Sequence, residues 1–187
     1  SVVNTQAWHT DPTPLYECNV EGLRNALDAA REENIDCFIF TSSMVTIGTN
    51  PNGRASEADA FNWWDTAPHY AKTRVLAENL MMEYCEKYAF PGIALCVANT
   101  YGPEDFQPTP HGQLIWNAAT GRLPTALDCS APTVDIRDAA EVALLAEQYG
   151  RFGERYIVAN EFLSQPELYA IAAAELVIGR RGRSDAQ

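Results

Sequence analysis

The stretch Cys37-Phe38-Ile39-Phe40-Thr41-Ser42-Ser43 is a short apolar run that ends on three hydroxyl side chains. Its apolar residues are consecutive rather than alternating, which predicts a strand covered on both faces, as in a parallel sheet. A second run with the same character occupies residues 93–98 and ends at Asn99. Longer segments of helical periodicity separate such runs. This alternation predicts an α/β domain with a mostly parallel sheet.

The remaining elements follow from periodicity and from the residues that start and stop helices. Asp11-Pro12-Thr13-Pro14 introduces a helix that extends to about residue 30, and Pro68 begins a strong helix that Pro91-Gly92 follows. The sequence also predicts a short strand at Val2-Val3, helices at about 111–120, 137–149 and 165–178, a strand at 156–159, a turn at 99–103, a loop between residues 120 and 137, and a frayed tail around Gly179 and Gly182.

Residues 48–68 are rich in Asn, Gly, Asp and Pro and show no period, so we expect a long loop. Trp63 and Trp64 lie in this loop, and Trp8 and His9 precede it. These side chains could line a pocket for a bulky apolar substrate. Aromatic residues that pin a long loop to the core would give the same pattern, so the sequence leaves both readings open.

Composition excludes several classes of function. The chain has 187 residues, 47% apolar and 20% charged, which is sufficient to form a core. Its net charge of -12 opposes binding to nucleic acid or to an anionic membrane surface. No run approaches the roughly 18 to 20 apolar residues of a membrane span, and the N-terminal residues do not resemble a signal peptide. We therefore expect a soluble, cytoplasmic protein.

The metal-ligating residue types are dispersed. The five cysteines stand far apart without a C-x-x-C pair, and the three histidines are distant from one another. Structural thiols are the simpler interpretation, and no metal site is predicted.

A tyrosine and a cluster of hydroxyls form the strongest candidate for chemistry. Thr41, Ser42 and Ser43 follow a buried strand, where ligands bind in open parallel sheets, and Tyr70 begins a long helix. The pKa of free tyrosine is about 10, so acid/base work near neutral pH requires a cation nearby. Arg74 lies four residues on, offset by about 40° around the helix, whereas the Lys72 side chain points away at about 200°.

Several segments together resemble a known family. Residues 70–78, Tyr-Ala-Lys-Thr-Arg-Val-Leu-Ala-Glu, are similar to the Tyr-x-x-x-Lys helix of the short-chain dehydrogenase/reductase superfamily, in its extended epimerase/dehydratase and dihydroflavonol-reductase-like branch. Further similar segments occur in the family order at residues 16–22, 38–43, 99–103, 134–140 and 153–156. The resemblance extends from Val2 to about Gly179. It implies a partial doubly wound, Rossmann-like parallel sheet with helices on both faces.

The resemblance also implies roles for individual residues. Tyr70 would be the general acid/base, Ser43 would hold the substrate oxygen, Asn19 would support the site, and Arg74 takes the position of the family lysine. The cofactor would be NAD or NADP, and the substrate a small molecule. The resemblance places cofactor contacts at Ala7, Thr41, Tyr70, Arg74 and Ala98, and substrate contacts at Ser43 and Asn99.

The chain departs from the family pattern in two ways. Arg74 replaces the lysine, and an arginine cannot release a proton in a relay. In addition, none of the 11 glycines forms the glycine-rich strand-to-helix turn that binds pyrophosphate. Because Val2–Ala7 resembles the fourth strand of the family, we expect the pyrophosphate-binding segment to be absent from this chain. We predict a division into residues 1–105, the later part of the Rossmann-like domain, and residues 106–187, on the substrate side.

Three functions remain in view. The leading hypothesis is an NAD(P)-dependent oxidoreductase acting on a hydroxyl/carbonyl pair. The alternatives are a nucleotide-sugar epimerase or dehydratase, and a noncatalytic remnant of the fold. The helices that follow Asp11 and Pro68 could pair across a homodimer, although packing on the sheet explains their apolar stripes equally well.

Overall fold

The computed structural model describes residues 11–105, 109–123 and 125–184. The strand predicted at Val2–Ala7 lies outside these ranges, as do Trp8 and His9. Contacts divide the chain into two compact units, one of residues 1–98 and 140–158 and the other of residues 99–139 and 159–187. The division predicted after residue 105 stays a prediction.

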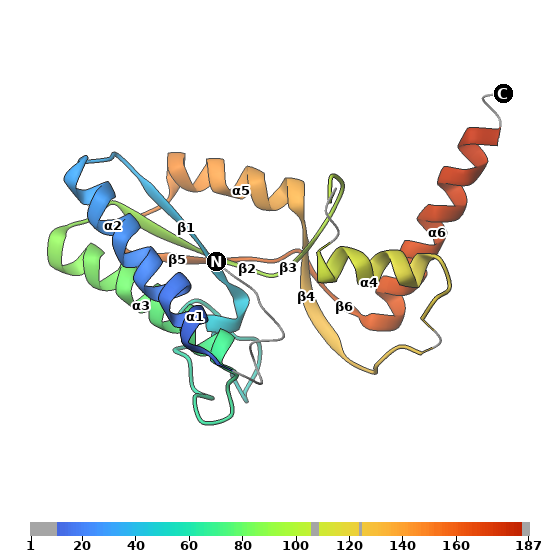
Figure 1. Ribbon diagram of the computed structural model, residues 1–187, viewed down its shortest axis with the longest axis horizontal. Coiled ribbons are helices and arrows are strands. Elements are labelled where there is room, and N and C mark those ends of the chain that lie inside the picture. The colour runs from blue at the N-terminus through green and yellow to red at the C-terminus, as the bar shows by residue number, and fades with distance from the viewer. Residues whose placement is uncertain (1–10, 106–108, 124, 185–187) are drawn as a thin grey trace. The chain divides into compact units, whose positions relative to one another are not determined.

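The first unit contains a parallel sheet with helices on both faces, which confirms the predicted fold class. The sheet has the order β1-β2-β5, and Phe38 pairs with Gly92 in the register of its first two strands. α2 and α3 cover one face, and α5 lies on the other (Figure 1). The elements are α1 (Thr13–Tyr16), η2 (Glu17–Glu21), α2 (Gly22–Glu32), β1 (Phe38–Ser43), η3 (Met44–Thr46), α3 (His69–Tyr88), β2 (Gly92–Val97), α5 (Ile136–Tyr149) and β5 (Arg155–Val158).

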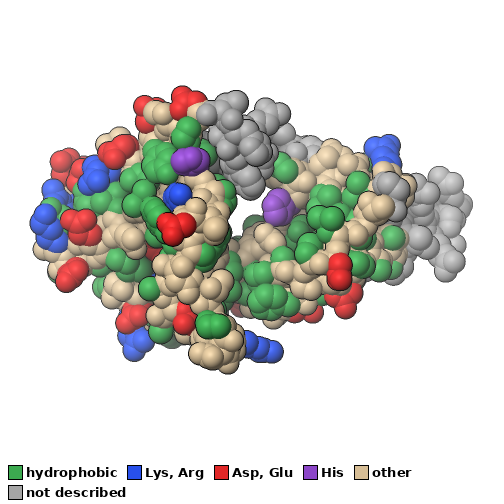
Figure 2. Space-filling view, turned by 90° about the horizontal axis from the view of Figure 1, so that it is seen from below, with side chains coloured by type: hydrophobic (Ala, Val, Ile, Leu, Met, Phe, Trp, Pro, Cys, Tyr) green, Lys and Arg blue, Asp and Glu red, His purple; other side chains and the backbone are tan. Residues whose placement is uncertain are grey.

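The second unit contains a smaller mixed sheet of order β3-β4-β6. β3 pairs parallel to β4, and β4 pairs antiparallel to β6. Its elements are β3 (Asn99–Tyr101), α4 (Pro110–Ala119), β4 (Ser130–Asp135), β6 (Glu161–Ser164) and α6 (Gln165–Ser184). Several large apolar side chains remain exposed, among them Trp116 and Phe162, and Figure 2 shows hydrophobic side chains on the molecular surface.

Three sequence predictions for the second unit were wrong. Residues 99–103 were expected to form a turn, but residues 99–101 form β3. The expected loop between residues 120 and 137 contains β4, which β3 and β6 hold on either side. The expected frayed tail continues the last helix, since α6 extends through Gly179 and Gly182 to Ser184.

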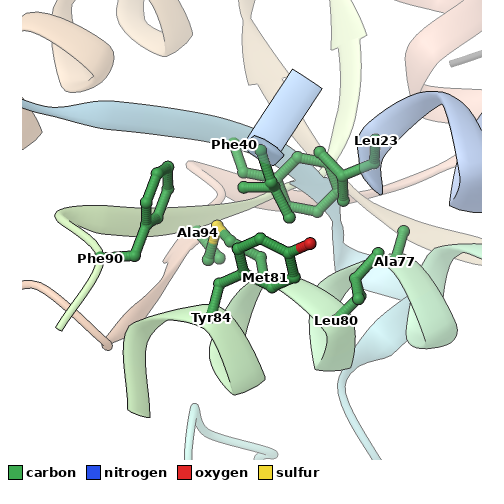
Figure 3. Packing of buried hydrophobic residues seen from close by; sticks show 9 residues of the cluster. Leu23, Phe40, Ala77, Leu80, Met81, Tyr84, Phe90 and Ala94 are labelled. Atoms are coloured by element: carbon green, nitrogen blue, oxygen red, sulfur yellow. The ribbon is translucent and has the colours of Figure 1, made fainter. Parts of the chain in front are cut away.

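The core of the first unit lies between α3, α2 and the sheet. Leu27 and Met81 are completely buried, and Phe40 and Tyr84 pack in the same cluster. Figure 3 shows side chains from α2, α3, β1 and β2 converging on this cluster. Burial of aliphatic and aromatic side chains at this interface fixes α3 against β1 and β2.

Hydrogen bonds join the two arms of the long loop, residues 47–68. The Thr49 N–H donates to Asn62 Oδ1 at 3.0 Å, and Asn62 Nδ2 donates to the Thr49 carbonyl at 2.7 Å. The Gly48 N–H donates to the Asp59 carbonyl at 3.0 Å. No helix or strand interrupts residues 47–68, as the sequence predicted, yet these hydrogen bonds give the loop a defined path.

Candidate functional site

The predicted catalytic tyrosine lies in the first turn of α3, where a chain of hydrogen bonds holds the backbone. Tyr70 is half-buried, and the Thr73 hydroxyl donates to the Tyr70 carbonyl at 2.8 Å. Asn19 Nδ2 in turn donates to Thr73 Oγ1 at 3.2 Å. Asn19 is buried in η2, a π-helical segment of the kind that often occurs at functional sites. Asn19 therefore reaches Tyr70 through Thr73.

Arg74 is the buried cation of the site. Its side chain is 3% exposed, its Nη2 donates to the Thr41 carbonyl, and its Cζ lies 5.0 Å from the centre of the Phe40 ring. Within the described residues, its Nε has no hydrogen-bond partner. Burial lowers the pKa of Arg74, whereas the Tyr70 oxygen and the Glu78 carboxylate act in the opposite direction. Tyr70 and Arg74 thus interact electrostatically.

The two serines at the end of β1 have different hydrogen-bond partners. Ser42 is buried, and its hydroxyl donates to Glu78 Oε2 on α3. Ser43 is half-buried and is the N-cap of η3, where its hydroxyl accepts from the Val45 N–H at 3.4 Å. That bond is long, so the Ser43 hydroxyl keeps capacity for another partner.

A buried carboxylate behind the strand end belongs to the site, although the sequence prediction missed it. Glu78 is 3% exposed, and its Oε2 also accepts from Thr46 Oγ1 at 2.8 Å and from Cys96 Sγ at 3.4 Å. Its Oε1 forms an ion pair with Arg155 Nη1 at 2.9 Å. Burial, with the Glu78 charge as the next cause, raises the pKa of Cys96 to about 12, so this thiol stays protonated.

Arg155 connects this carboxylate to the long loop. Its guanidinium donates to the carbonyl oxygens of Glu57 at 2.8 Å and Asp59 at 3.0 Å. In return, Glu57 Oε1 accepts the N–H of Ile157 in β5 at 2.9 Å. These reciprocal bonds, termed here the Arg155 clamp, fix residues 57–59 of the loop that joins Ser43 to Tyr70.

The predicted residues are distributed over both units. Ser43, Thr41, Tyr70, Arg74, Asn19 and Ala98 lie in the first unit, whereas Asn99 is the first residue of β3 in the second. Ala7 lies outside the described residues. Hydrogen bonds connect Asn19 to the Tyr70 turn and Arg74 to Thr41. That Ser43 and Tyr70 both hydrogen-bond to one substrate oxygen stays a prediction.

A weak signal for the missed carboxylate exists in the sequence. Glu78 follows Arg74 by four residues, so both side chains share one helix face, and Val75 adds an apolar neighbour. A carboxylate on a helix face with apolar neighbours indicates that it is buried and paired with a cation. The sequence does not show that Arg155 is the cation that pairs with Glu78, because Arg155 is distant in sequence and becomes a neighbour only through the pairing of β2 with β5.

The described residues contain neither a membrane-spanning helix nor a metal-binding cluster. None of the helices within residues 11–105, 109–123 and 125–184 has both the length and the apolar content to cross a bilayer. Over the same ranges, no cluster of three or more His, Cys, Asp or Glu side chains is arranged to hold a metal ion.

Comparison with known proteins identifies curated relatives of this chain. Sterol demethylase protein B of Methylococcus capsulatus is 30% identical over 155 residues, covering 81% of this chain and 46% of that protein. Cinnamoyl-CoA reductase 2 of Arabidopsis thaliana is 27% identical over 172 residues, covering 87% of this chain and 52% of that protein. The chain therefore spans about half the length of these curated relatives.

Solved structures agree in fold. The crystal structure of gox2253 superposes with a TM-score of 0.84 at 27% identity, covering 94% of this chain and 54% of that one. A Thermus thermophilus UDP-glucose 4-epimerase in complex with NAD gives 0.78 at 21% identity, covering 94% and 60%. The model of the NAD dependent epimerase/dehydratase family matches residues 2–159. With the Tyr70 helix, the serine-ended strand and the parallel sheet inside that match, the chain belongs to the NAD dependent epimerase/dehydratase family.

Proposed function

We propose that this chain carries the acid/base residues of an NAD(P)-dependent oxidoreductase that interconverts a hydroxyl and a carbonyl group on a small molecule. The observation that supports this proposal most directly is the buried Arg74 guanidinium and its electrostatic interaction with Tyr70. A fixed positive charge stabilises a phenolate relative to a phenol, which is what a tyrosine needs to exchange a proton near neutral pH.

Each residue then has a distinct task. Tyr70 gives a proton to the substrate oxygen in reduction and removes it in oxidation. Ser43 donates a hydrogen bond to the same oxygen, and Asn99 contacts the substrate. Asn19, through Thr73, keeps the first turn of α3 in place, so that the phenol does not have to be oriented during the reaction.

The residues present fit the nicotinamide end of the cofactor. The unsatisfied Arg74 Nε is a buried donor without a partner in the described residues, and ribose hydroxyls are acceptors that would satisfy it. We propose Thr41, Tyr70, Arg74, Ala98 and Ala7 as the residues that hold this end. When bound, NAD(P) supplies or accepts the hydride. The described residues contain no glycine-rich strand-to-helix turn for the pyrophosphate.

We also propose a homodimer in which α2 and α3 of two copies pair. The position of both helices in the family supports this proposal, whereas their apolar residues, such as Leu27 and Met81, are buried in the core of the first unit. Sedimentation at several concentrations would test it, and a monomer at all concentrations would contradict it.

The function is tested on the protein in its natural length with Tyr70→Phe. NADH or NADPH should raise the melting temperature of the wild type and of this variant alike. Reduction of a panel of aldehydes and ketones should fall by at least about 100-fold in Tyr70→Phe, because the proton donor is lost. Tyr88→Phe, at the exposed end of the same helix, is the matched control and should keep its turnover.

Arg74 variants separate its charge from its shape. In Arg74→Lys the cation remains, whereas Arg74→Met removes it, so Arg74→Met should lower kcat/KM for reduction more strongly than Arg74→Lys does. If neither nicotinamide cofactor raises the melting temperature of the wild type, the oxidoreductase proposal is rejected. If Tyr70→Phe keeps full turnover, the assigned role of Tyr70 is rejected.

A further inference from the structure

A cavity lies in the first unit. Its volume is about 500 Å³, and its walls come from the long loop, from α3 and from the turn that precedes β5. Neither Tyr70, Ser43 nor Arg74 lines it. This volume falls within the range of pockets that bind small molecules in proteins.

One wall of the cavity is aromatic and apolar. The rings of Phe61 and Trp64 meet edge to face with their centroids 5.8 Å apart, and Val75 and Met82 of α3 also line the space. Trp64 is 42% exposed, so part of its surface is available to a ligand. The Lys72 Nζ lies 5.8 Å from the centre of the Trp64 ring, and Lys72 itself does not line the cavity.

The polar wall carries an excess of negative charge. Glu57, Glu78 and Glu154 line the cavity together with a single cation, Arg155. The Arg155 charge is already matched by Glu78, at 2.9 Å in a nearly buried pair. Glu57 receives one N–H from β5, and Glu154 is exposed and has no ion pair among the described residues. Two carboxylates therefore remain without a counter-ion at the cavity.

The cavity is held open by bonds that do not involve a ligand. The Arg155 clamp fixes residues 57–59, and the hydrogen bonds between Thr49 and Asn62 close the loop behind them. A site whose walls are already ordered loses less conformational entropy on binding. Aromatic surface, uncompensated carboxylates and preformed walls together select for one kind of ligand.

We propose that this cavity binds a small organic cation, with its ammonium group at the Glu57 and Glu154 carboxylates and its flat apolar body against Phe61 and Trp64. A neutral ligand of the same shape would leave both carboxylates unmatched, and an anionic one would be repelled. The proposal does not depend on the oxidoreductase function, because none of the residues assigned a role in that reaction lines the cavity, although Glu78, which accepts from Ser42 at the candidate site, contributes to its wall.

Tryptamine is a suitable probe, with tryptophol as its neutral counterpart and indole-3-acetate as its anionic one. Calorimetric titration should give tryptamine a dissociation constant on the order of 1 mM or lower, about tenfold weaker binding of tryptophol, and no binding of indole-3-acetate. Amide chemical shifts should move in residues 57–64 and 153–155 and stay constant around Tyr70.

Three variants locate the charges and the ring. Glu154→Gln and Glu57→Gln should each weaken tryptamine binding by about three- to tenfold, because glutamine keeps the acceptor oxygen for Ile157 but removes the charge. Trp64→Leu should weaken tryptamine and tryptophol alike. Glu83→Gln, at an exposed position on α3 outside the cavity, is the control and should bind as the wild type does.

Three outcomes overturn the proposal. The first is no tryptamine binding up to 10-fold above the expected dissociation constant. The second is equal affinity for tryptamine and tryptophol. The third is a double variant, Glu154→Gln with Glu57→Gln, that binds tryptamine as tightly as the wild type does, while the chemical shift changes fall outside residues 57–64 and 153–155. Failure of the oxidoreductase test leaves these measurements unaffected, because they require no turnover and no nicotinamide.

Discussion

Glu78 and Arg155 form a nearly buried ion pair at the junction of α3, the end of β1 and the long loop. Their side chains are 4% and 19% exposed. Removing one member of such a pair leaves a charge with little solvent, so Arg155→Met should lower the free energy of unfolding by about 3 kcal/mol in denaturant titrations. The double variant Arg155→Met with Glu78→Gln should lose less than the sum of the two single variants.

A matched control comes from the exposed pair of Arg137 and Asp135. Their atoms approach to 2.6 Å, but the Arg137 side chain is 74% exposed, and water replaces its partner at little cost. Arg137→Met should therefore change the free energy of unfolding by less than about 1 kcal/mol. Equal losses in Arg155→Met and Arg137→Met would contradict the assigned importance of burial.

Cys96 should make the protein less stable at alkaline pH. Burial raises its pKa from 9.0 to about 12, and the Glu78 charge contributes further. Between these values the unfolded thiol loses its proton while the folded thiol keeps it, so the folded state binds more protons and stability falls as pH rises. The expected slope is at most about 1.4 kcal/mol per pH unit, measured by urea unfolding at pH 8 to 11.

The comparison for Cys96 uses Cys96→Ala and an exposed thiol. Cys96→Ala should show a shallower alkaline decline than the wild type, while Cys129→Ser should show the same decline as the wild type. At pH 8, iodoacetamide should modify Cys18 and Cys129 and leave Cys96 unmodified, as judged by peptide mass spectrometry. Rapid modification of Cys96 in the folded protein would show that its thiol is not buried.

At this scale the sequence offers candidates where a local motif exists. Ser43 was predicted from the end of an apolar strand, and Tyr70 and Arg74 from their spacing on one helix, and their roles stay predictions. Glu78 and Arg155 were missed because their pairing depends on the lateral order of strands, which no local pattern encodes. Asn19 was placed near the site by resemblance, whereas its contact with Thr73 required the packing of η2 on α3.

At the scale of elements, the long loop depends on a close approach at Gly48. A methyl group added at Gly48 would come within 2.0 Å of the Ala60 carbonyl oxygen, so the backbone must separate there. Gly48→Ala should destabilise the protein by about 1 to 3 kcal/mol and increase the rate of proteolysis in residues 49–62. Gly53→Ala has open space and should have no comparable effect on either measurement.

The predictability of elements followed the strength of their periodicity. α3 and β2 were located to within one residue, because a long helical period and a continuous apolar run are strong local signals. β4 and β6 were missed. Their sequences, Ser-Ala-Pro-Thr-Val-Asp and Glu-Phe-Leu-Ser, are short and do not alternate, so pairing with each other determines their conformation.

At the scale of the whole molecule, the net charge of -12 should prevent association with polyanions. Fluorescence anisotropy of a labelled DNA duplex should not change on addition of the protein at 50 mM salt, where electrostatic binding would be strongest. Binding that weakens as salt increases would contradict this expectation, because such behaviour requires a cationic surface that the overall composition does not suggest.

The Arg155 clamp has a consequence for how the chain can change in length. Arg155 donates hydrogen bonds to the backbone at positions 57 and 59, so a related sequence that keeps both bonds must preserve the spacing of these two positions. Insertions and deletions should instead accumulate at the tip, residues 51–54, whose path no strand dictates. In homologous genes, and in engineered grafts of foreign peptides, that tip is the place where extra residues would be accommodated most easily.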